Sequence, residues 1–180
     1  MEGRFLDNIF NAFELDLPRD IDTMENALKF ILPKIKPWGG SITDTSLWQG
    51  PRFLEIHGTD AWDKSFIHIF QETGEHLIFD TGVMTKRNWN VLGPSLLLEE
   101  GGRTIMYDVE FINDVFIVLK QNSTNRYFVL GSESFVRKIN FNWRDAMEEL
   151  YNVYRHNSRF SMWIMLIIAL VVLFFGYIYT

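Results

Sequence analysis

Three histidines are spaced so that they can meet in a folded β-domain. His57, His68 and His76 fall in three successive segments whose alternating pattern predicts strands. Imidazoles brought together in this way can bind a metal ion or transfer protons. Metal sites usually add a carboxylate or a cysteine at a defined spacing, however, and no such ligand pattern accompanies these histidines. His68 also shares a strand face with Phe66 and Phe70, so we expect histidines of an apolar wall and no metal site.

Sequence signatures of catalysis are absent. The chain has no cysteine, no Gly-x-Ser-x-Gly elbow, no glycine-rich phosphate loop and no His-Glu-x-x-His pattern. Asp60 and Asp63 lie in the stretch HGTDAWDK, which lacks the repeating oxygen ligands of a calcium loop. The sequence therefore predicts a protein that is not an enzyme and that needs no cofactor.

Side chains suited to hold a small ligand are more numerous. Binding pockets combine aromatic and aliphatic walls with a few polar groups. The candidates that offer stacking or charge are Trp89, Arg103, Tyr107, Arg126 and Tyr127. Alternation alone does not reveal which strand face points inward, so the alternative that these residues lie on the outside stays open.

The middle of the chain predicts a β-domain. Eight short alternating segments are separated by Gly, Asn, Asp, Ser and Pro, which favour turns. The predicted strands are 48–57, 65–71, 75–80, 83–92, 95–99, 103–110, 115–121 and 126–130. Short connections make neighbours in sequence neighbours in space, and closure removes free sheet edges. We therefore expect residues 41–140 to form a small antiparallel up-and-down barrel of about eight strands, mainly β with flanking helices.

A pair of helices is predicted before the barrel, within residues 1–40. The first covers residues 4–15, and the second begins at Asp22 and is expected to end or kink at Pro33. We expect this pair to plug or flank one end of the barrel. Its lysines, Lys29, Lys34 and Lys36, either attract anionic lipid headgroups or form the solvated face of a packed helix.

The last stretch predicts a transmembrane helix. Residues 160–179 carry no charge, and about 20 residues at roughly 1.5 Å each match the hydrocarbon core of a bilayer. The residues expected to anchor it are Trp163, Leu166, Leu170, Phe174 and Tyr177. An amphipathic juxtamembrane helix over 141–159 is expected to continue into this span. The alternative is a buried core helix at the same place.

Charge predicts the orientation. Arg155 and Arg159 precede the span, and basic residues stay on the cytoplasmic side of a membrane. The acidic, polar first residues do not resemble a cleavable signal, so we expect a single-pass protein with a cytoplasmic domain in a bacterial inner membrane. The net charge of −6 argues against binding to nucleic acid polymers.

The run from HIFQETGEHLIFDTG through WNVLGPSLLLEEGGRTIMYDVEFINDVFIVLK to NRYFVL resembles the small lipocalin-like β-barrel domains of uncharacterised bacterial proteins. This resemblance implies a ligand-binding or scaffolding role. The chain is also similar, more loosely, to membrane-tethered barrel effectors of bacterial antiphage signalling. That similarity implies a barrel that binds a cyclic nucleotide and assembles through membrane helices.

Two functional hypotheses follow. In the first, the chain is an accessory or scaffold subunit that meets a protein partner in a membrane complex and whose barrel is filled by its own side chains. In the second, a small signal enters an open, basic-lined barrel and drives self-association through the transmembrane helix. The acidic body favours the first hypothesis.

Overall fold

The computed structural model describes residues 17–18, 20–58, 66–124 and 126–157. The predicted helix 4–15, the Asp60 and Asp63 loop, Arg159 and the predicted span 160–179 with its five anchor residues lie outside this part. Within the described part, no helix is both long enough and apolar enough to cross a bilayer.

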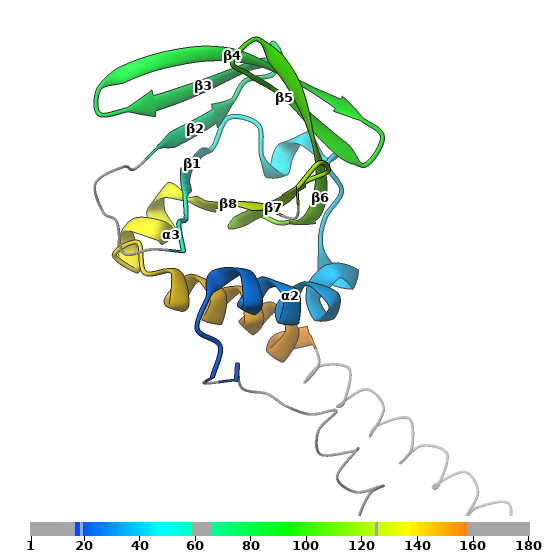
Figure 1. The fold of residues 1–180 in the computed structure, drawn as a ribbon, viewed down its shortest axis with the longest axis vertical. Helices are drawn as coiled ribbons and strands as arrows, with labels where there is room; N and C mark the ends of the chain where they lie inside the picture. Colours follow the sequence, from blue (N-terminus) through cyan, green and yellow to red (C-terminus); the bar gives the residue numbers. More distant parts are fainter. Residues whose placement is uncertain (1–16, 19, 59–65, 125, 158–180) are drawn as a thin grey trace, which may run out of the picture.

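Eight antiparallel strands close into a barrel in sequence order, and the first strand pairs with the last (Figure 1). This confirms the predicted up-and-down barrel. The strands are β1 (Arg52–Glu55), β2 (Ile67–Phe70), β3 (Glu75–Asp80), β4 (Val83–Leu92), β5 (Ser95–Glu100), β6 (Arg103–Ile112), β7 (Phe116–Gln121) and β8 (Tyr127–Ser132).

The first strand is shorter than predicted. Its expected first residue, Trp48, instead follows a short 3₁₀ helix, η2 (Thr45–Leu47), and the strand starts only at Arg52. Gly50 between them has φ of 89°, a conformation that a residue with a side chain rarely adopts. Pro51 follows and has no N–H to donate to a neighbouring strand, so the ladder begins after it.

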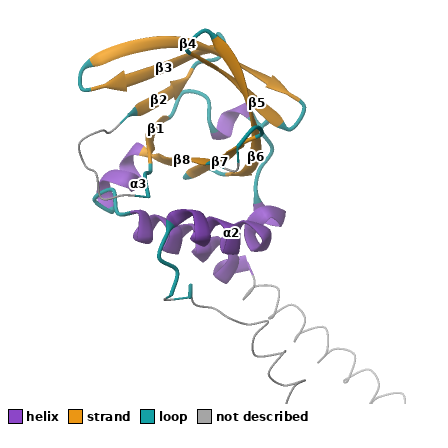
Figure 2. Cartoon of the chain, in the orientation of Figure 1, coloured by secondary structure: helices purple, strands orange, loops and turns teal. Residues whose placement is uncertain are grey.

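Helices cover one wall of the barrel (Figure 2). They are α2 (Met24–Ile35), the 3₁₀ helix η1 (Lys36–Trp38), α3 (Glu133–Lys138) and the helical residues 143–157. The prediction that the N-terminal helical segment plugs or flanks one end is therefore corrected. Its described helix, α2, buries an apolar face against the outside of the wall instead of entering the barrel mouth.

The second helix differs from its prediction at both ends. Thr23, and not Asp22, is the N-cap, because its hydroxyl accepts from the backbone N–H of Asn26 at 3.2 Å. The helix also continues through Pro33 to Ile35. Pro33 and Lys29 both face solvent, where water can replace the hydrogen bond that the proline cannot donate to the Lys29 carbonyl.

Two apolar cores lie on the two faces of the same strands. On β7, Phe116 and Val118 pack under the helices, whereas Ile117 and Leu119 face the barrel interior. Covering both faces explains why this strand is a continuous apolar run and does not alternate. The wall beneath the helices is therefore packed on both faces, and it carries one side of the barrel interior.

Candidate functional site

The barrel interior is filled at one end and open at the other. At the filled end, the fully buried Trp48 packs edge-on against Phe70 and Trp89, with ring centroids 5.4 and 4.6 Å apart. Both indoles donate to backbone carbonyls: Trp48 to Ile42 at 3.0 Å, and Trp89 to Gln71 and Glu75 at 3.1 Å. Trp48, which directly follows η2, therefore fills this end of the barrel, where the sequence led us to expect that helices would plug or flank it.

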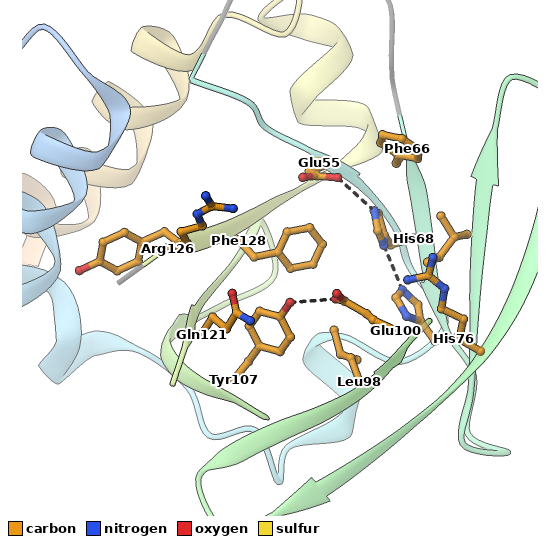
Figure 3. Close-up of a pocket in the computed structure, with 13 residues that line it drawn as sticks. Glu55, Phe66, His68, His76, Leu98, Glu100, Tyr107, Gln121, Arg126 and Phe128 are labelled. Atoms are coloured by element: carbon orange, nitrogen blue, oxygen red, sulfur yellow. Dashed lines mark hydrogen bonds and ion pairs between the residues drawn. The ribbon is translucent and has the colours of Figure 1, made fainter. Parts of the chain in front are cut away.

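The open end holds a cavity of about 400 Å³, within the size range of small-molecule sites (Figure 3). Its lining residues are Glu55, Phe66, His68, His76, Ile78, Arg87, Leu98, Glu100, Tyr107, Gln121, Arg126, Tyr127 and Phe128. They come from all eight strands and from the residues beside them, so closure of the barrel is what brings them together.

Two buried histidines pair in the cavity wall. Nδ1 of His68 and Nε2 of His76 are 3.0 Å apart, and the His76 ring stacks on Phe70 at 4.4 Å. Glu55 approaches the far nitrogen of His68, Nε2, at 3.8 Å (Figure 3). Which of the two rings donates depends on their tautomers, because each imidazole nitrogen can either donate or accept. Burial, the neighbouring His68 and Arg87 lower the pKa of His76 to about 3, which keeps this ring neutral at physiological pH.

A second polar pair lies on β5 and β6. The hydroxyl of Tyr107 donates to Glu100 at 2.8 Å, and only 7% of the tyrosine is exposed. Burial, together with this hydrogen bond, raises the pKa of Tyr107 above its ordinary value. Tyr107 therefore remains a hydrogen-bond donor, and it occupies one of the acceptor positions of the Glu100 carboxylate.

The two arginines of the cavity differ from its two glutamates in having no partner. Glu55 is approached by His57 at 3.5 Å as well as by His68, and Glu100 is held by Tyr107. Arg87 and Arg126 form no ion pair or side-chain hydrogen bond with any residue in the described ranges. In Figure 3, Arg126 and His76 lie on opposite sides of the cavity, and Arg87 is paired with His76 across β3 and β4. The cavity thus has positive charge available from two walls.

Three of the five predicted ligand-binding residues line the cavity: Tyr107, Arg126 and Tyr127. Trp89 belongs to the filled end, and Arg103 is exposed at the start of β6. Sequence reasoning did not select Glu55, His68, His76, Arg87 or Glu100 for a ligand site. One signal was present, since Arg87 is two residues from Trp89 and therefore shares its strand face.

Metal binding has little geometric support here. Across residues 17–157, leaving aside the gaps named above, no group of three or more His, Asp or Glu side chains is placed to hold a metal ion. The histidines do converge, but they do so as a hydrogen-bonded pair with Glu55 at its side.

No protein-family model matches the chain, and neither the curated proteins nor the solved structures provide a match. The resemblance to lipocalin-like domains therefore stays a prediction from the pattern of strands and turns.

Proposed function

We propose that this protein is a non-enzymatic, membrane-anchored β-barrel that binds a small organic anion in the open end of the barrel. The observation that carries the proposal is the cavity of about 400 Å³ in which both arginines lack protein partners, whereas Glu100 accepts from Tyr107 and Glu55 lies beside two histidines. An unpaired guanidinium beside an apolar wall is a favourable place for a carboxylate or phosphate. The scaffold hypothesis predicts a barrel filled by its own side chains, and this end of the barrel is not filled in that way.

The ligand's acidic group lies between Arg87 and Arg126, and its apolar or planar body lies against the aromatic side of the cavity. Phe66 and Phe128 provide ring faces, and Leu98 adds an aliphatic surface. Gln121 offers an amide that can donate or accept. A cyclic nucleotide is one molecule with these properties, and a simple aromatic carboxylate is another.

Location is part of the same proposal. Residues 160–179 cross the bilayer, Arg155 and Arg159 keep the barrel on the cytoplasmic side, and a bacterial inner membrane is the setting. Ligand binding changes the association of these spans with one another or with a partner.

The test is calorimetric titration of the detergent-solubilised full chain with 2-naphthoate and its neutral amide, and with cyclic adenosine monophosphate and neutral adenosine. We expect at least one anion to bind and its neutral counterpart to bind about tenfold more weakly or not at all. Arg87→Gln and Arg126→Gln should each weaken binding about 10- to 100-fold, because each removes a charge-assisted contact.

Arg103→Gln is the matched control, since it removes the same charge from a position outside the cavity. It should leave affinity unchanged. Equal binding of the neutral compounds, or an equal loss in the Arg103→Gln variant, would contradict the proposal.

A second candidate function is that of an accessory or scaffold subunit. It is favoured by an apolar row on the outer face of the barrel, where Ile67, Phe79 and Met84 pair across β2, β3 and β4. Met84 is 56% exposed. Purification in mild detergent with mass spectrometry tests this function: a stoichiometric partner that Met84→Glu releases supports it, and recovery of this chain alone favours the ligand-binding role.

A further inference from the structure

Trp38 stands apart from the tryptophans that plug the barrel. It lies on the short 3₁₀ helix η1 and is 38% exposed, among the few large apolar side chains on the described surface. Trp48 and Trp89 give their indole N–H groups to backbone carbonyls, whereas Trp38 donates to no residue of the described chain. An indole with a half-exposed ring and an available N–H is suited to a boundary between apolar and polar surroundings.

The exposed indole is held in place by a distant part of the sequence. Its ring packs on Tyr154 with centroids 5.8 Å apart, and Tyr154 stacks on Tyr151 at 5.5 Å. Nζ of Lys34 lies 5.4 Å from the Tyr154 ring and 3.8 Å from that of Phe30. We call the exposed Trp38 together with Tyr154 the aromatic patch. In Figure 1 the end of α2 that continues into η1 lies beside the end of the helical residues 143–157.

The aromatic patch lies close in the sequence to the predicted membrane span. Tyr154 lies six residues before Phe160, where the uncharged apolar run begins. Six residues reach about 20 Å at most, whatever their conformation, so the patch stays near the start of that run. Tryptophan and tyrosine concentrate at the interface between headgroups and hydrocarbon.

From this arrangement we propose that the aromatic patch rests in the bilayer interface and fixes the barrel against the membrane. The inference relies on the proposed membrane anchor but not on ligand binding. The chain then meets the lipid at two places, the span itself and a surface contributed by η1, and the second contact limits rotation of the barrel about the first.

The lysines of this region do not account for the proposed contact with the bilayer. Lys29 pairs with Glu25 at 2.8 Å, Lys36 pairs with Glu110 at 3.1 Å, and Lys34 covers an aromatic ring. The sequence left two interpretations of these lysines: binding of lipid headgroups, or the outer face of a packed helix. Because all three already contact side chains of the protein, the second interpretation fits them better. The contact should therefore depend on the indole and only weakly on anionic lipid or salt.

The absence of cysteine in the chain allows single-site labelling. The full chain is labelled with an environment-sensitive fluorophore at Pro37→Cys, which keeps Trp38, and is reconstituted in phosphatidylcholine vesicles that contain lipid spin-labelled near the headgroup. Control labels are Val83→Cys, exposed in the hairpin on the far side of the barrel from the helices, and Leu166→Cys in the predicted span.

We expect the lipid quencher to reduce emission at positions 37 and 166 and not at position 83. Adding Trp38→Asp should restore the emission at position 37, and replacing part of the lipid by phosphatidylglycerol should not change it. Quenching at position 166 but not at position 37 overturns the interface contact and leaves the anchor intact. Absence of quenching at position 166 overturns the anchor and this inference with it.

Discussion

The two ends of the barrel are built by the same strands and differ in nearly every physical property. On β1 the inward face carries Phe53 at the filled end and Glu55 at the cavity, and on β2 it carries Phe70 and then His68. On β4 the same step of two residues leads from Trp89 to Arg87. Each of these three strands thus changes from apolar to polar along a single inward-facing row.

The filled end contributes stability, and the open end is where the proposed ligand site lies. At the filled end the rings interlock, and the indole N–H groups have backbone partners, so this end contributes stability. At the cavity, one buried nitrogen of His68 and one of His76 have no hydrogen-bond partner within the described residues. Unsatisfied buried polar groups cost folding free energy, and their place in the wall of the open end is consistent with the proposed ligand site.

The largest effect is expected from truncating the same residue type at the two ends. Phe70→Ala should lower the free energy of unfolding by about 3–5 kcal/mol, because a fully buried ring leaves a void between Trp48 and Trp89. Phe128→Ala should cost about half as much, since its ring borders an existing cavity. Urea unfolding of the full chain in detergent measures both, and equal costs would remove the distinction between the ends.

A smaller loss of unfolding free energy is expected when the pH is lowered. The unfolded chain protonates His76 near pH 6.5, and the folded chain does so only near pH 3, so the unfolded state binds more protons between these values. The stability due to neutral His76 is complete above pH 6.5 and is lost as pH falls toward 3, with about 3 kcal/mol lost at pH 4.

Comparing urea unfolding of the wild type with that of His76→Phe at pH 7 and pH 4 isolates this residue from the carboxylates that titrate in the same range. The variant should lose distinctly less stability on acidification. Equal losses in the two proteins would show that the buried histidine pair does not make the open end sensitive to acid.

The smallest effect is expected from removing the tyrosine hydroxyl that lines the cavity. Tyr107→Phe removes the donor to Glu100 and should cost about 1 kcal/mol of unfolding free energy, because the half-buried carboxylate loses one hydrogen bond. Anion binding should weaken as well, since Glu100 then faces the ligand without its partner. Unfolding and titration on the same preparation measure both, and tighter anion binding in the variant would contradict the roles given to this pair.

The sequence predicts the strands well because turn chemistry marks their limits. The ranges 75–80 and 83–92 coincide with β3 and β4, and the glycines before and between them, Gly74 and Gly82, have φ of 82° and 89°. Positive φ is a local requirement that the residue type itself reveals. The closed barrel then follows from short connections.

The site could be predicted only in part because it depends on which face points inward. Tyr107, Arg126 and Tyr127 were selected for their chemistry, and Trp89 was selected on the same grounds although it lies in the filled end. The approach of Glu55 to His68 depends on the register between β1 and β2 and on a buried environment. Residue types alone reveal neither this register nor this burial. The packing of helices on one wall also joins distant parts of the sequence, so it could not be predicted from local pattern.

The pairing that closes the barrel is short. β1 and β8 share only the register Phe53 to Ser132, Leu54 to Gly131 and Glu55 to Leu130, whereas β5 pairs with β6 along its whole length. β1 pairs with its other neighbour, β2, over three residues as well, so local opening of the barrel wall is expected on either side of β1, whose Glu55 borders the cavity. Because α3 begins directly after β8, opening on that side of β1 would change the spacing between the barrel and its helices.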